Sequence, residues 1–170
     1  MSVLTIVTGQ DTQILRTPCE PLTSFGADLM TLCENMALTM RTSKGVGIAA
    51  PQVGQNLRVF ILAKEAFNPE QSSWRVLKGP ELDPKQDLSV INPQIAIKNE
   101  GFTVIEEGCL SIPNRYGYVP RAKRVVLLAQ NINGEVFKLQ AKGFLARVIQ
   151  HEFDHLQGTL ICDKFVSANV

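Results

Sequence analysis

The chain has 170 residues, which is the usual size of one domain with a single hydrophobic core. Hydrophobic residues make up 45% of it, and 17 basic against 16 acidic side chains leave a net charge of +1. This balance gives no electrostatic indication of a nucleic-acid partner or an anionic membrane surface. No apolar run approaches the ~18 residues of a membrane span, and the first residues lack the basic start and apolar core of a secretory signal.

The N-terminal part of the chain predicts one helix and one strand. Over Ala27–Arg41, apolar residues recur at intervals of three and four, as on one face of a helix: Leu29, Leu32, Met36 and Met40. Gly45 and Gly47 end this helix and open a loop. The next segment, Arg58–Ala63, is rich in β-branched and aromatic residues and predicts a strand.

The segment Lys64–Asp87 is polar and shows no hydrophobic period. It contains three prolines, Pro69, Pro80 and Pro84. We therefore expect a long loop, which Trp74 anchors to the rest of the domain by burying its indole ring.

The C-terminal part predicts strands followed by a helix. Three strand-like runs are Ser89–Asn92, Phe102–Glu106 and Val125–Gln130. Asn133-Gly134 precedes the apolar run Val136–Leu139 and predicts a hairpin turn. Phe144–Leu156 has the apolar spacing of a helix, and Gly158 is well placed to end it. We predict an α+β fold over residues 1–170, in which antiparallel strands pack around a C-terminal metal-binding helix, with an N-terminal helix.

The C-terminal helix carries the sequence His151-Glu152-Phe153-Asp154-His155, which holds the only two histidines of the chain. Residues four apart lie on one helix face, so both imidazoles can reach one ion. Glu152 lies between them and can contact a metal-bound water without being a ligand. The apolar residues that precede His151 indicate a buried helix, and two buried histidines need partners that a metal can supply.

A hydrolytic metal site usually has three protein ligands, so one ligand is still missing. Asp163 is the only acid after His155. Cys109 is the more attractive candidate, because it follows a predicted strand and is flanked by Gly108 and Pro113. A small buried hydrophobe is the alternative interpretation of Cys109.

The four cysteines are widely and irregularly spaced, unlike a disulfide framework. They are Cys19, Cys33, Cys109 and Cys162. We therefore expect a reducing compartment, the cytoplasm.

Three separated blocks of the sequence resemble the signature motifs of the peptide deformylase family, in the same order. They are GVGIAAPQ (Gly45–Gln52), EGCLS (Glu107–Ser111) and HEFDH (His151–His155). The resemblance implies a metal-dependent hydrolase that removes the N-formyl group from the formyl-methionine of newly made peptides and releases formate. It also implies one divalent ion, ferrous iron first, with zinc, nickel or cobalt as alternatives.

The resemblance also implies a role for each site residue. Cys109, His151 and His155 bind the metal, and water takes the fourth position. Glu152 acts as the general acid and base, while Gln52 and the backbone N–H of Leu110 hold the formyl oxygen. The residues expected to contact the peptide are Val46, Gly47, Gly108 and Val148.

Several features depart from the family pattern, and two of them affect the expected site and partners. Arg147 stands where an apolar residue is more common near the methionine pocket, and we expect its charge to point outward into solvent. Only residues 156–170 follow His155, so docking on the ribosome through a longer C-terminal helix is not expected.

Two alternatives remain open. An HExxH peptidase that cuts internal peptide bonds would have a histidine or a carboxylate as its third ligand. A non-catalytic relative would bind formylated peptides or a metal without turnover. Cys109 in its own motif argues against the first alternative, and the presence of Glu152 and Gln52 argues against the second.

Overall fold

The computed structural model describes residues 1–167 of the chain. Within these residues, six strands form one sheet in the order β1-β2-β4-β5-β6-β3, and every neighbouring pair is antiparallel. The strands are β1 (Gly47–Ala49), β2 (Val59–Leu62), β3 (Ser72–Lys78), β4 (Leu88–Cys109), β5 (Ile112–Gln130) and β6 (Val136–Gly143).

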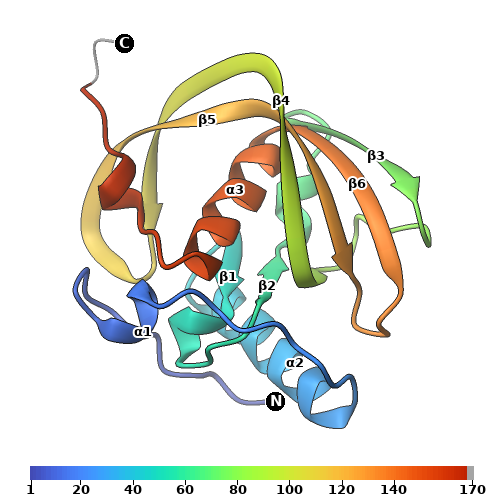
Figure 1. The fold of residues 1–170 in the computed structure, drawn as a ribbon. Coiled ribbons are helices and arrows are strands. Elements are labelled where there is room, and N and C mark those ends of the chain that lie inside the picture. Colours follow the sequence, from blue (N-terminus) through green and yellow to red (C-terminus); the bar gives the residue numbers. More distant parts are fainter. Residues whose placement is uncertain (168–170) are drawn as a thin grey trace.

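Three α-helices and three short 3-10 helices accompany the sheet in the described residues. They are α1 (Gln13–Arg16), α2 (Ala27–Thr42), α3 (Phe144–Leu156), η1 (Ala50–Val53), η2 (Lys64–Phe67) and η3 (Ile161–Lys164). Figure 1 shows α3 inside the space around which the strands curve, with α2 beside β1 and β2. None of the described helices is long and apolar enough to cross a membrane.

Strand β2 separates two hydrophobic clusters. Phe60 and Leu62 belong to the cluster that packs on α3, whereas Val59 and Ile61 belong to the cluster that packs on α2. Successive side chains of a strand point to opposite faces, so an uninterrupted apolar run can serve both clusters. This arrangement explains why the residues of β2 are all apolar, instead of alternating between apolar and polar.

The predicted α+β architecture is confirmed, and α3 has the predicted bounds. Gly158 follows it with a φ of 70° and donates its N–H to the carbonyl of His155, as expected of a helix end. The predicted hairpin joins β5 to β6, with Gly134 at a φ of 80°. The two predicted strands before it, Ser89–Asn92 and Phe102–Glu106, are parts of the single strand β4.

The prediction of a long loop over Lys64–Asp87 is wrong for its central part. Ser72–Lys78 forms β3, which pairs with β6 at the edge of the sheet. Covered and exposed residues alternate along β3, but of the three covered residues Ser72 is polar, so the apolar alternation is too short to be recognised. Trp74 does anchor the segment, since it is partly buried against the hydrophobic cluster that packs on α3, with its ring edge-on to Phe67 at a centroid distance of 5.5 Å.

Candidate metal centre and active site

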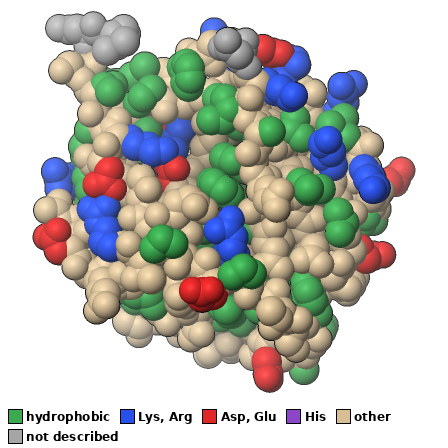
Figure 2. Space-filling model, in the orientation of Figure 1, with side chains coloured by type: hydrophobic (Ala, Val, Ile, Leu, Met, Phe, Trp, Pro, Cys, Tyr) green, Lys and Arg blue, Asp and Glu red, His purple; other side chains and the backbone are tan. Residues whose placement is uncertain are grey.

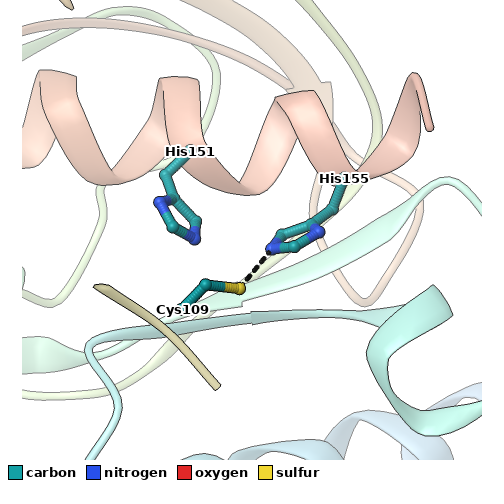
Figure 3. Close-up of side chains that lie close together, drawn as sticks. All are labelled: Cys109, His151 and His155. Atoms are coloured by element: carbon teal, nitrogen blue, oxygen red, sulfur yellow. Dashed lines mark hydrogen bonds between the residues drawn. The ribbon is translucent and has the colours of Figure 1, made fainter. Parts of the chain in front are cut away.

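Three potential metal ligands meet where α3 faces the end of β4. His151 and His155 project from one side of α3 toward the thiol of Cys109 (Figure 3). The Cys109 Sγ lies 3.3 Å from the Nε2 of His155, and one ligand atom from each of the three residues lies within 4.8 Å of the others. This donor set and spacing fit a tetrahedral ion with three protein ligands.

A β-bulge presents Cys109 to the helix. The pairing of β4 with β5 shifts register between Glu107 and Cys109. Such a shift bends a strand and redirects the side chains beside it. His155 is buried, at 1% exposed, and His151 is half-buried, with 13% of its side chain exposed. Neither imidazole is visible on the face drawn in Figure 2.

His151 is held by negatively charged neighbours. Its Nδ1 lies 3.0 Å from Oε2 of Glu107, which leaves Nε2 for another partner. Burial lowers the pKa of His151, but the hydrogen bonds with Cys109 and Glu107 outweigh it and raise the pKa to about 10. The same negative groups would favour a metal cation in place of that proton.

Glu107 is the centre of a buried charge network. Its Oε1 accepts hydrogen bonds from Arg121 at 3.0 Å and from Arg147 at 2.6 Å, and its Oε2 accepts another from Arg121 at 2.9 Å. Arg121 also pairs with Asp154. Burial raises the pKa of Glu107, but the hydrogen bonds from His151 and Arg121 outweigh it and hold the pKa well below its usual range. The carboxylate is therefore fixed in its charged form beside His151.

The expectation that Arg147 points into solvent is wrong. Its side chain is only 7% exposed, because the guanidinium turns inward to Glu107. A buried charge is tolerated when an opposite charge and enough acceptors surround it. Here the acceptors lie on β4 and β5. The sequence of the helix therefore could not predict that Arg147 is buried.

Glu152 lies on α3 between the two histidines and lines the same pocket as Cys109. It is 3% exposed, and its Oε2 has no hydrogen-bond partner among the described residues. Burial raises the pKa of its carboxyl to about 7, against the opposing effect of His151. Gly47 of β1 faces this carboxylate so closely that a Cβ on Gly47 would lie 2.7 Å from its Cδ. Glycine therefore leaves the space that Glu152 occupies.

Gln52, in η1, points its amide nitrogen at the same group. Its Oε1 accepts the N–H of Ala49 at 2.8 Å, so the amide is oriented and its Nε2 faces Ser111 Oγ at 3.2 Å and Cys109 Sγ at 3.6 Å. The oriented Nε2 is a hydrogen-bond donor fixed beside the candidate metal position.

These groups open into a pocket of about 850 Å³. Its lining contains all four residues that we expected to contact a peptide, and also Leu110: Val46, Gly47, Gly108, Val148 and Leu110. Ile105 and Tyr116, exposed by 51% and 67%, extend the lining with apolar surface. A Cβ on Gly108 would lie 2.6 Å from the Tyr116 ring, so any larger residue here would displace that exposed side chain.

Comparison with known proteins shows the family of this chain. A sequence profile of the polypeptide deformylase family matches residues 3–169. The chain belongs to this family. It is 41% identical to Peptide deformylase 1 of Bacillus cereus over 164 residues, covering 96% of this chain and 93% of that protein. It is 39% identical to the peptide deformylase of Halothermothrix orenii, covering 90% of this chain and 88% of the relative.

The fold leads to the same family. The crystal structure of the peptide deformylase from Thermotoga maritima superposes with a TM-score of 0.83 at 35% identity, covering 98% of this chain and 100% of that one. Polypeptide deformylases are metal-dependent hydrolases that remove N-formyl groups from newly made peptides, and this chain is a hydrolase of that family.

Sequence reasoning missed two residues that organise this deformylase site. Glu107 belongs to the second motif, and its place two residues before Cys109 was the available signal. Nothing in the sequence indicated Arg121 as a site residue. A buried arginine on a strand can be recognised only when its two carboxylate partners, here Glu107 and Asp154, are known.

Proposed function

We propose that this chain hydrolyses the formamide bond of N-terminal formyl-methionine in newly made peptides and releases formate, with one divalent ion bound by Cys109, His151 and His155. The observation that carries the proposal is the convergence of three separate motifs on one pocket. A thiol, one imidazole, a buried carboxylate and an oriented amide line it, and the second imidazole lies against the thiol.

The donor set limits the choice of ion. One thiolate and two imidazoles suit iron, cobalt, nickel and zinc, and we propose ferrous iron as the native ion because of the family resemblance. Bound at this site, the ion would lower the pKa of water at its open position toward about 7 and polarise the formyl carbonyl. Glu107 would support it by fixing the tautomer of His151, with Nδ1 as the donor.

Glu152 is the proposed general base and acid. Its free Oε2 and its burial beside the candidate ion suit a group that takes a proton from water and then delivers it to the departing amine.

Gln52 and the backbone N–H of Leu110 are the proposed donors to the developing oxyanion. The Gln52 amide is already oriented by Ala49 and need not reorganise during the reaction. The loss of one such donor typically costs roughly 100-fold to 1,000-fold in rate.

The peptide is proposed to lie extended in the pocket. β1 is an edge strand, so the side of it that β2 does not occupy can pair with a substrate backbone. Val46 and Val148 would then contact the methionine side chain, while Gly47 and Gly108 let the peptide backbone approach closely. We place the reaction in the cytoplasm, which the four free cysteines support.

The test is formate release from formyl-Met-Ala-Ser by anaerobically purified protein of known metal content. Glu152→Gln is the matched variant, since it keeps the size of the side chain but cannot accept the proton. We expect it to retain the metal and lose at least about 100-fold in turnover. Metal-loaded protein without formate release, or a Glu152→Gln variant with wild-type turnover, would contradict the proposal.

A further inference from the structure

Arg147 connects the metal-binding helix to two strands. It lies on α3 one turn before His151, and its Nη1 donates to the Glu107 carboxylate at 2.6 Å and to the Val119 carbonyl at 3.0 Å. Its Nη2 donates to the carbonyl of Thr103 at 2.8 Å and to the Thr103 hydroxyl at 2.9 Å. Four hydrogen bonds thus fix one guanidinium between α3, β4 and β5.

The Glu107 carboxylate bridges two residues of the same helix. Its Oε1 takes the hydrogen bond from Arg147, and its Oε2 lies 3.0 Å from Nδ1 of His151. Residues four apart occupy the same face of a helix, so one carboxylate can join them. Glu107 is therefore attached to α3 at two points, and neither oxygen is free to rotate away.

Arg121 alone would not give the same constraint. It binds both oxygens of Glu107 as a fork from β5, at 3.0 and 2.9 Å, and so fixes the carboxylate relative to the sheet. Arg121 reaches α3 only through its separate ion pair with Asp154, whereas Arg147 and His151 contact the carboxylate directly from the helix. Without Arg147, the only direct hydrogen bond between the Glu107 carboxylate and α3 would come from a candidate metal ligand.

We propose that Arg147 is a positioning residue of the metal site, which acts through Glu107 to hold the His151 imidazole with Nδ1 toward the carboxylate and Nε2 toward the ion. This inference rests on the metal site of the proposed function. Partners of ligating histidines typically change metal affinity by roughly 10-fold to 100-fold when they are lost, and Arg147 is one step further out.

The test measures how fast the metal leaves the protein. Protein loaded with cobalt or zinc is mixed with an excess of a chromophoric chelator, and the release rate is compared among variants. Arg147→Met keeps the stem of the side chain, which lines the pocket, and removes the guanidinium. We expect release about 10-fold faster in Arg147→Met and an intermediate rate in Arg147→Lys, which keeps the charge but loses the fork.

Gln150→Met is the matched control. Gln150 is as buried as Arg147, at 6% exposed, and its side-chain amide also ties α3 to β5 by hydrogen bonds with Ala122. It does not contact Glu107. We expect Gln150→Met to lower the melting temperature but to leave metal release within about 3-fold of wild type. Equal acceleration in the two variants would overturn the proposal, because loosening of the helix would explain both.

A double-mutant cycle with Glu107→Gln tests whether Arg147 affects metal release through Glu107. If Arg147 acts through Glu107, then Arg147→Met should add less than about 3-fold in release rate to the Glu107→Gln variant. Full additivity, or wild-type release from Arg147→Met, would overturn the inference while leaving the proposed function intact. A wild-type protein that binds no stoichiometric metal would overturn both.

Thr103→Val keeps the test decisive if Arg147→Met does not fold. Thr103 is exposed, and the substitution removes only the hydroxyl that accepts from Arg147. We expect faster metal release, by about 2-fold to 5-fold, without a matching loss of stability. Release at the wild-type rate from both Thr103→Val and Arg147→Lys would overturn the proposal.

Discussion

The close packing of Gly47 against the proposed catalytic carboxylate gives a sharp test of its role. A Cβ at this position would lie 2.7 Å from Cδ and 2.8 Å from Cγ of Glu152. Carbon atoms that are not bonded prefer separations of about 3.5–4.0 Å. Gly47→Ala must therefore push the Glu152 side chain away by the order of 1 Å. The backbone of β1 itself accepts alanine, since it is extended and pairs regularly with β2.

The expected effect on turnover is much larger than the effect on stability. General acid–base catalysis contributes about 100-fold to 10,000-fold, and a 1 Å misplacement of a reacting group can cost about 100-fold. We therefore expect Gly47→Ala to lower kcat/KM by at least about 100-fold, or ~3 kcal/mol in activation free energy. Because the displaced group is the end of a side chain, the free energy of unfolding should fall by only ~1–3 kcal/mol.

The assay combines formate release from formyl-Met-Ala-Ser, metal content and unfolding in urea. Gly26→Ala is the matched control, because a Cβ on Gly26 meets nothing within 4 Å. The control should keep both activity and stability, and Gly47→Ala should keep its metal. A Gly47→Ala variant within about 3-fold of wild-type kcat/KM would refute the assignment of Glu152 as the group that transfers the proton.

Three further predictions concern other parts of the structure. Ser72→Ala should cost ~1–2 kcal/mol of unfolding free energy in urea, because the hydroxyl accepts the N–H of Leu145 at the start of α3, whereas exposed Ser73→Ala should cost almost nothing. Burial raises the pKa of Cys19 to about 11 and also raises that of Cys33, so neither should react with a thiol reagent until denaturant is added; rapid native labelling of either would contradict their burial. The ferrous form should lose activity in air faster than the nickel or cobalt form, and equal decay of all three forms would contradict iron-centred oxidation.

The site was more predictable from the sequence than the sheet was. Helix periodicity and the spacing of His151 and His155 depend only on local geometry, so the bounds of α3 and the pairing of the imidazoles followed directly. The third ligand needed more, because His151 lies 42 positions after Cys109 in the sequence (109 to 151). Composition alone left Asp163 open as the alternative. Asp163 instead pairs with Arg16 and caps η3.

The failures share a physical cause, which is dependence on distant partners. β3 has few apolar residues, and its pairing with β6 is what makes it a strand. Arg147 is turned inward by a carboxylate 40 residues away, and periodicity on the helix cannot report that charge. Amphipathic analysis places an arginine in solvent by default, because an unpaired buried charge is costly. The rule fails for Arg147 because its charged partner, Glu107, lies on a different element, β4.

The polar residues of α3 explain how a helix buried on nearly every side can still have one defined register. Apolar packing tolerates small rotations and shifts, whereas hydrogen bonds to fixed strand atoms do not. Gln150 bonds both the N–H and the carbonyl of Ala122, and Arg147 and His151 both bond Glu107. A slip of one residue along the helix, about 1.5 Å and 100°, would break all of these contacts and leave buried polar groups without partners. The candidate metal ligands therefore take their positions from protein contacts elsewhere on the same helix, and an ion would bind to a geometry that the chain already holds.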